Sequence, residues 1–290
     1  MNRFAVHSPH EAQRDKIAHF EGKPPAGGHR SPVYAGMIAS VDDSVRRVLG
    51  KLDELKLSQN TLVIFSSDNG GVGGYVTAGI RTREGITDNA PLRGGKGMLY
   101  EGGVRVPFIF RWPGRIQSGT LCGEPIISVD LFPTLLALSG APKPKAQPLD
   151  GVSLLPLLES DGNAKIGREA LYWHFPGYLG SGRNIWRTTP AGAVRMGDYK
   201  LLEFFEDGRL ELYHVREDTG QKHDLAKEKP EVLRQLHAKL VTWRQEIKAP
   251  MPTPRAGFQE RKTGDPSPAS PNAAKPRRAK NRRPDPGARP

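Results

Sequence analysis

A short apolar run in the first quarter of the chain places the strongest limit on its fold. Residues 61–66 are Thr-Leu-Val-Ile-Phe-Ser, and Asp68-Asn69-Gly70-Gly71 follows almost directly. Continuous runs rich in β-branched and aromatic residues are typical of strands buried on both faces, as in parallel sheets. Ligand sites of open α/β sheets lie just outside the carboxyl ends of such strands. The run therefore predicts a core strand with a candidate site at its end.

The segments on either side predict an α/β sheet with helices on its faces. Residues 32–57 carry apolar side chains at helical spacing, and Ser31 is a suitable N-cap. Residues 104–112 predict a second buried strand, and residues 130–139 predict a short helix. The first 30 residues are polar and rich in Gly, Pro and His, which predicts irregular structure.

The sequence changes character near residues 142–148, after which it predicts a smaller antiparallel unit. Strand candidates follow one another within residues 170–215 and flank a turn at Gly197-Asp198. An Asp-Gly pair at Asp207-Gly208 between apolar runs is a strong hairpin signal. Pro230 then opens an amphipathic helix. We expect three parts: an α/β domain in 1–150, an antiparallel domain with a terminal helix in 151–248, and a disordered basic tail in 249–290.

The net charge of +12 is concentrated in that tail. Residues 249–290 contain ten Lys and Arg against three Asp and Glu, together with ten prolines. This composition predicts a solvated, disordered extension, with nucleic-acid binding as the alternative, and we expect no specific nucleic-acid partner. No apolar run approaches the roughly 18 residues of a membrane span, and the first ten residues lack a signal-peptide pattern.

Two clusters of residues could carry chemistry. Asp68 and Asn69 offer hard oxygen ligands suited to Ca²⁺ or Mg²⁺, although Asp-Asn-Gly-Gly is also an ideal turn sequence. Residues 93–103 surround Lys96 with paired glycines, so that backbone could approach a bound group and the ammonium could face an oxyanion. A flexible surface loop is the alternative. The segment is not a Walker A loop, because Gly97 stands where Ser or Thr should follow the lysine.

Taken in order, these segments resemble the arylsulfatase family. The resemblance covers roughly residues 1–247 and leaves out the tail. Several motifs in the family's order are far more specific than any one of them. The segments that carry it are residues 5–9 (Ala-Val-His-Ser-Pro), the helix around Asp42-Asp43, and residues 62–70, 92–97, 100–107, 112–114, 130–134, 150–154, 211–215 and 224–225.

The resemblance implies an alkaline-phosphatase-like fold, with a mixed sheet between helices and a small four-stranded antiparallel domain with a terminal helix. It also implies hydrolysis of sulfate esters, on a sulfated small molecule or a sulfated glycan. The family binds one divalent cation, usually Ca²⁺, and Asp68 and Asn69 match two of its ligands. Lys96 and His7 match residues that contact the sulfate group. A cation, a lysine and a histidine would together offset charge on the sulfuryl oxygens.

The nucleophile of the family has no match in this sequence. It is a formylglycine made from the first residue of a Cys/Ser-x-Pro/Ala-x-Arg motif, whereas Cys122, the only cysteine, is followed by Gly-Glu-Pro-Ile. In the family, this motif and two more metal-binding aspartates precede the position that His7 matches. We therefore expect a carboxy-terminal part of a sulfatase, with an α/β domain incomplete at its amino end and no activity by itself.

Three other interpretations remain open from the sequence. They are a non-catalytic sulfatase remnant that binds anions, a phosphoester hydrolase on the same fold, and a protein that binds nucleic acid through its tail. Relatives in the family are often periplasmic, extracellular or lysosomal, but the sequence itself leaves the compartment open. It also leaves the natural substrate and the oligomeric state undetermined.

Overall fold

The computed structural model describes residues 6–80, 86–182 and 185–253. The chain as far as Pro252 forms one compact unit. The basic tail from residue 254 lies outside the described residues, so its disorder stays a prediction, as does the domain boundary near residue 150. None of the helices in the described residues combines the length and the apolar character needed to cross a membrane.

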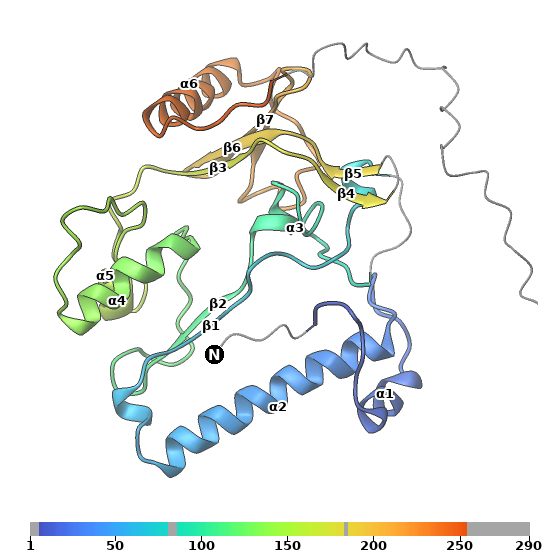
Figure 1. Ribbon diagram of the computed structural model, residues 1–290, viewed down its shortest axis with the longest axis vertical. Coiled ribbons are helices and arrows are strands. Elements are labelled where there is room, and N and C mark those ends of the chain that lie inside the picture. The colour runs from blue at the N-terminus through green and yellow to red at the C-terminus, as the bar shows by residue number, and fades with distance from the viewer. Residues whose placement is uncertain (1–5, 81–85, 183–184, 254–290) are drawn as a thin grey trace, which may run out of the picture. The chain divides into compact units, whose positions relative to one another are not determined.

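Helix α2 (Pro32–Glu54) is the longest helix in the described residues, and it begins at the predicted N-cap. The Ser31 hydroxyl accepts a hydrogen bond from the Tyr34 N–H at 3.2 Å. Helix α1 (Arg14–Glu21) packs along α2, as Figure 1 shows. The prediction of irregular structure for the first 30 residues is therefore wrong for α1, because its partner surface on α2 is not visible in its own sequence.

Strands β1 (Val63–Ser66) and β2 (Phe108–Arg111) form an antiparallel pair. The apolar runs predicted strands buried on both faces, as in a parallel sheet, but the described residues show an antiparallel pair with exposed side chains instead. In them, each of these strands has the other as its sole neighbour. Phe65 and Ile109 face one another across the ladder and are 39% and 57% exposed. The second strand is also shorter than predicted, because residue 104 ends helix α3 (Glu101–Val104).

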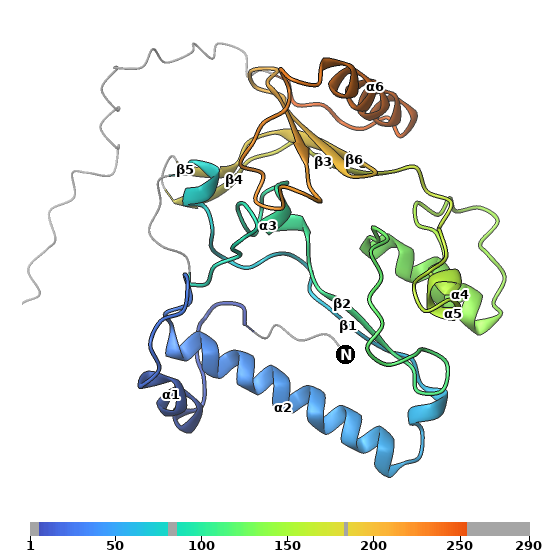
Figure 2. The same ribbon diagram turned by 180° about the vertical axis from the view of Figure 1, so that it is seen from behind.

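The predicted antiparallel unit is a four-stranded sheet with the strand order β3-β6-β7-β8. Gly197 and Gly208 make its turns with positive φ angles of 58° and 68°, as the hairpin signals indicated. Helix α6 (Pro230–Glu246) covers one face of the sheet, whereas α3 lies on the other side (Figures 1 and 2). The strands are β3 (Ala170–Phe175), β6 (Ala191–Met196), β7 (Tyr199–Phe204) and β8 (Leu210–His214).

The face of this sheet opposite α6 packs against the glycine-rich region of the chain. Met98 and Tyr100 belong to one buried cluster with Ala193, Leu202 and Tyr213 of the sheet. This contact is what places residues 93–103 on a rigid base. Other short elements are β4 (Leu179–Gly182) and β5 (Ile185–Thr188), which form a hairpin, together with α4 (Leu131–Ser139), α5 (Leu155–Glu159) and the 3₁₀ turns η1 (Ser58–Asn60), η2 (Val76–Ala78) and η3 (Ser128–Asp130).

Candidate functional site

Two glycine-rich segments pack backbone against backbone: the first glycine segment, residues 69–74, and the second glycine segment, residues 93–103. The Lys96 N–H donates a hydrogen bond to Gly71 O at 2.9 Å. A Cβ atom on Gly95 would lie only 2.1 Å from a carbonyl oxygen of the first segment. The glycines are thus required for close approach, and the alternative of a free surface loop does not describe residues 93–103.

The side chain of Asn89 joins the two glycine segments. Its Oδ1 accepts a hydrogen bond from Gly71 N–H at 2.9 Å. Its Nδ2 lies 3.1 Å from Gly71 O, 3.2 Å from Gly73 O and 3.0 Å from Gly94 O, and its two N–H groups are shared among these three acceptors. Sequence reasoning missed this residue, because its partners are backbone groups, several of them 16 to 18 positions away. An isolated asparagine in a loop carries no sign of such a role.

Asp68 and Asn69 follow the end of β1, as predicted. The Asp68 side chain is exposed, and no hydrogen bond or ion pair within the described residues engages its carboxylate. The Asn69 Nδ2 donates to Gly70 O at 3.3 Å, which leaves Oδ1 available as a ligand. Both oxygens therefore suit a hard cation, but no cluster of three or more His, Cys, Asp or Glu side chains in the described residues could hold one. Since Ca²⁺ takes six to eight oxygens, two are only part of a site.

Lys96 lies in the second glycine segment with its main chain fixed and its side chain half-buried. Its carbonyl oxygen accepts a hydrogen bond from Tyr75 Oη at 3.3 Å, and Thr188 of β5 donates to the next carbonyl, that of Gly97. Within the described residues, no carboxylate pairs with the Lys96 ammonium. The lysine therefore offers an uncompensated positive charge on a fixed backbone, which is what an anion site needs.

His7 stands apart from this arrangement in the described residues. Its side chain is exposed, and its Nδ1 lies 2.9 Å from Ser8 O, to which the ring can donate. No contact in the described part of the chain joins it to Lys96 or to Asp68. The role of His7 at the sulfate group therefore stays a prediction.

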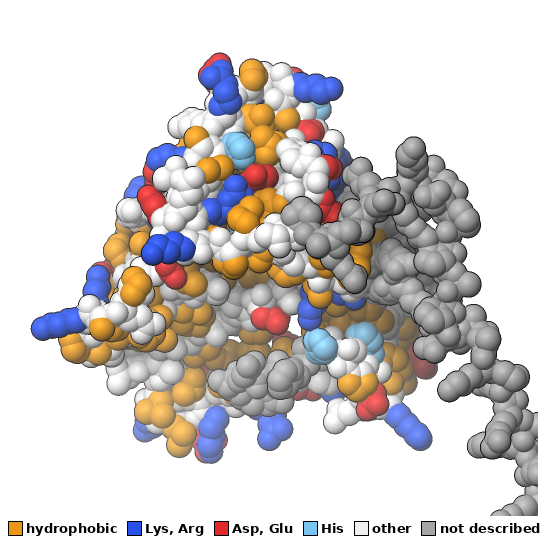
Figure 3. All heavy atoms as spheres, turned by 45° about the horizontal axis from the view of Figure 1, so that its top comes forward, with side chains coloured by type: hydrophobic (Ala, Val, Ile, Leu, Met, Phe, Trp, Pro, Cys, Tyr) orange, Lys and Arg blue, Asp and Glu red, His pale blue; other side chains and the backbone are white. Residues whose placement is uncertain are grey.

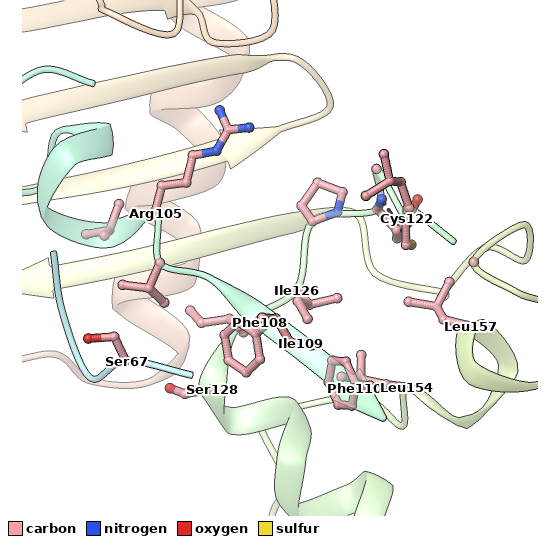
Figure 4. A pocket seen from close by; sticks show the side chains of 18 of the residues that line it. Ser67, Arg105, Phe108, Ile109, Phe110, Cys122, Ile126, Ser128, Leu154 and Leu157 are labelled. Atoms are coloured by element: carbon pink, nitrogen blue, oxygen red, sulfur yellow. Dashed lines mark hydrogen bonds between the residues drawn. The ribbon is translucent and has the colours of Figure 1, made fainter. Parts of the chain in front are cut away.

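A wide cleft of about 1500 Å³ runs from the candidate site over β2. Ser67, Asp68, Asn69 and Gly97 line its polar end. Figure 4 shows Ser67 and Arg105 toward one end, with apolar side chains of β2 and of its surroundings along the rest. The volume exceeds the roughly 300–1000 Å³ of typical small-molecule pockets. The end lined by Ser67, Asp68 and Asn69 is the candidate site, and the remainder is lined by apolar side chains mixed with charged ones such as Arg111 and Asp161.

Two family models match this chain. The model described as Sulfatase matches residues 4–141, and the model described as N-sulphoglucosamine sulphohydrolase, C-terminal, matches residues 95–246. The chain belongs to the sulfatase family. Lys96 lies in the overlap of the two matches, at the point where the glycine segments meet the four-stranded sheet.

Similar proteins agree with this assignment. A sulfatase of Formosa agariphila is 36% identical over an alignment of 218 positions, and the match covers 70% of this chain and 36% of that protein. The human steryl-sulfatase is 39% identical over 164 residues, which are 57% and 28% of the two chains. The crystal structure of Ps i-CgsB in complex with k-i-k-neocarrahexaose superposes with a TM-score of 0.66 at 29% identity, and covers 82% of this sulfatase chain and 47% of that one.

These matches confirm the family and the fold class that the sequence motifs predicted. The chain is a member of a family of sulfuric ester hydrolases, with the mixed helix and sheet architecture of sulfatases. It spans about a third of the length of the two curated relatives and about half of the solved structure. The activities of the full-length relatives are therefore assigned to this chain only as a proposal.

Proposed function

We propose that the chain forms the lysine- and metal-binding side of a sulfatase active site, and that the site hydrolyses sulfate esters. The observation that carries the proposal is the hydrogen bond from Lys96 N–H to Gly71 O at 2.9 Å. It joins the second glycine segment, which carries Lys96, to the first glycine segment, which begins at Asn69 next to Asp68. A divalent cation held by these two side chains would withdraw charge from the sulfuryl oxygens, and the ammonium would act in the same direction.

The proposal assigns the nucleophile to a segment outside these 290 residues. No Cys or Ser in the chain stands in a Cys/Ser-x-Pro/Ala-x-Arg motif, and the exposed Cys122 is followed by Gly-Glu-Pro-Ile. Covalent catalysis needs a nucleophile within reach of the sulfur atom. The residues described here would bind and polarise the sulfate group, and a formylglycine in that outside segment would supply the nucleophile.

A sulfated sugar is the substrate class that we propose. The matching solved structure was determined with k-i-k-neocarrahexaose, and one matching family model is that of an N-sulphoglucosamine sulphohydrolase. The open cleft beside the site is larger in volume than a typical small-molecule pocket, which favours an extended substrate. The match to a steryl-sulfatase makes steroid sulfate the comparison substrate in a test.

The test compares the 290-residue chain with the same chain joined to an amino-terminal sulfatase segment that carries a Cys-x-Pro-x-Arg motif. Both are co-expressed with a formylglycine-generating enzyme and assayed with Ca²⁺ and 4-nitrophenyl sulfate. We expect turnover only from the joined protein. In that protein, Lys96→Ala should lower kcat on the order of a hundredfold or more, because the ammonium acts mainly on the transition state.

The matched control is Lys145→Ala, which removes an exposed lysine that lies outside both glycine segments. It should leave kcat unchanged, and His7→Ala tests the histidine in the same assay. Near-normal turnover of the Lys96→Ala protein would refute the role of the lysine. Turnover by the 290-residue chain above that of its own Lys96→Ala variant would refute the external nucleophile.

A further inference from the structure

The second glycine segment begins and ends on the four-stranded sheet. At its start, Arg93 Nη1 donates to Tyr213 Oη at 2.8 Å and to Gln221 O at 3.0 Å. Near its end, Lys200 of β7 donates to Glu101 Oε1 at 2.8 Å. The Glu101 N–H donates to Gln221 Oε1 at 2.6 Å. Both ends of the segment therefore depend on the same sheet and on the same glutamine.

Backbone hydrogen bonds close the segment into a loop with Lys96 inside it. The Gly102 N–H donates to Arg93 O at 2.8 Å, which ties the two ends together. Within the loop, the Met98 N–H donates to Gly95 O at 3.0 Å. Because the loop is closed at its base, a shift of the base on the sheet moves Lys96 with it.

Aromatic side chains strengthen the start of the loop. The Arg93 guanidinium lies over the Tyr100 ring, 4.2 Å from its centroid. The hydroxyls of Tyr100 and Tyr213 both donate to Glu211 Oε2, at 2.7 and 2.8 Å. These contacts anchor Arg93 to strand β8, which is the neighbour of β7, the strand that contains Lys200.

The ion pair at the end of the loop is buried. The side chains of Lys200 and Glu101 are 0% and 3% exposed. Burial raises the pKa of Glu101, but Lys200, together with Arg195 and Arg105, outweighs this and the net direction is downward. Burial lowers the pKa of Lys200, against the opposing effect of Glu101. Such pairs contribute little net stability, since lost hydration offsets their attraction and apolar side chains of similar volume often serve as well.

A buried ion pair and an apolar pair can contribute similar stability, but only the ion pair makes a hydrogen bond with a fixed direction. The Nζ–Oε1 hydrogen bond fixes the position of Glu101 relative to β7, whereas two apolar side chains could slide against one another. Since Glu101 follows Lys96 by five positions in the closed loop, fixing Glu101 fixes the loop. Stability alone therefore does not account for a charged pair at this place.

We propose that Glu101 and Lys200 are positioning residues, which hold Lys96 at its place in the site through the closed loop. The four-stranded sheet is then part of the sulfate-binding machinery and not only a carboxy-terminal extension of the fold. The inference rests on the proposed function, because the sulfate contact of Lys96 is what gives its position a catalytic meaning.

The test is amide hydrogen exchange by NMR on the 290-residue chain, without substrate. It compares the parent, Lys200→Met, the double variant Glu101→Met/Lys200→Met, and Lys239→Met. Lys239 forms an exposed ion pair with Glu169 at 2.7 Å, so its variant is the matched control. The amides that report on the loop are those of Lys96, Met98 and Gly102, and those that report on the sheet are of Leu201 and Leu212.

We expect the double variant to keep the exchange of the sheet amides at the parent level, because the apolar pair fills the same space. The loop amides should exchange about tenfold faster or more, because the loop can then open without having to break the hydrogen bond between Lys200 and Glu101. Lys239→Met should change neither set. Lys200→Met leaves the buried Glu101 with only the longer 3.8 Å ion pair to Arg105, and it should accelerate exchange of the loop amides at least as much.

Two outcomes would overturn the inference. Parent-like protection of the loop amides in the double variant would mean that the pair only fills space. Equal acceleration of loop and sheet amides in that variant would mean that the pair only stabilises the fold. Both outcomes are independent of turnover, so a failure here is separate from a failure of the Lys96→Ala test of the proposed function.

Discussion

At the scale of single residues, Asp68 carries the metal hypothesis. Its carboxylate is exposed and unpaired in the described residues, so Asp68→Ala should leave folding unchanged and weaken Ca²⁺ binding. We expect the joined sulfatase protein to lose bound Ca²⁺ and metal-dependent turnover with this substitution. Atomic absorption after dialysis measures the first and the aryl sulfate assay the second. The control is Asp42→Ala on α2, and unchanged Ca²⁺ content in the Asp68→Ala protein would exclude the aspartate as a ligand.

Tyr213, which anchors Arg93 to the sheet, makes the stability of the fold sensitive to alkali. Burial raises the pKa of Tyr213 to about 12, above the value of about 10 expected in the unfolded chain. Its contribution to stability is therefore complete below pH 10 and is lost as the pH rises toward 12. Between these values, the free energy of unfolding should fall by about 2 to 3 kcal/mol more in the parent than in Tyr213→Phe. Urea unfolding at each pH measures this, and equal losses in both proteins would contradict it.

Residue identity predicted part of the candidate site and left the rest hidden. Asp68, Asn69 and Lys96 stand in motifs whose chemistry is evident, and the structure brings their segments together. Asn89 and Lys200 stand in no motif. Their importance arises from backbone groups and a carboxylate that are distant in the sequence, and no local pattern encodes such partners.

At the scale of elements, the packing of the two glycine segments makes a sharp prediction. A Cβ atom on Gly95 would lie 2.1 Å from Gly73 O and 2.6 Å from Gly71 O, and backbone cannot move aside as a side chain can. Gly95→Ala should therefore cost about 1 to 3 kcal/mol in the free energy of unfolding. In the joined protein it should also lower turnover.

Gly167→Ala is the matched control, because a Cβ atom there would meet nothing within 4 Å. Chemical denaturation measures both variants, and the aryl sulfate assay shows whether the site is displaced. If Gly95→Ala proved as stable and as active as Gly167→Ala, the two segments would not be packed as described.

Elements whose signals are local were predicted well, and those that depend on distant partners were not. The turns at Gly197 and Gly208 follow from their own residues, as does the start of α2 at Ser31. By contrast, α1 forms against α2. The short helix α3 interrupts the predicted strand, and Gln221 caps the Glu101 N–H there. Neither contact can be inferred from the neighbouring sequence.

At the scale of the whole molecule, the strand pair β1–β2 is a route to self-association. Phe65 and Ile109 are exposed on strands with an unpaired edge in the described residues, and such edges and patches invite association with other chains. Figure 3 shows many Lys and Arg side chains of one face at its margin, with hydrophobic side chains between them. We expect the 290-residue chain to form oligomers as its concentration rises.

Ile109→Lys should reduce this association, since it places a charge on the exposed face of β2. Val76→Lys changes another exposed apolar side chain, 66% exposed, at a place away from the strand pair and should have little effect. Light scattering across a concentration series measures both. If Ile109→Lys left the association unchanged, the self-associating surface would lie elsewhere on the protein.

The way Asn89 holds the two glycine segments has a consequence for how this protein can evolve. The partners of its side chain are main-chain atoms of glycines. Main-chain atoms stay the same when neighbouring side chains mutate. Side chains at the rim of the cleft, and with them the preferred substrate, can therefore change during evolution while Lys96 keeps its position.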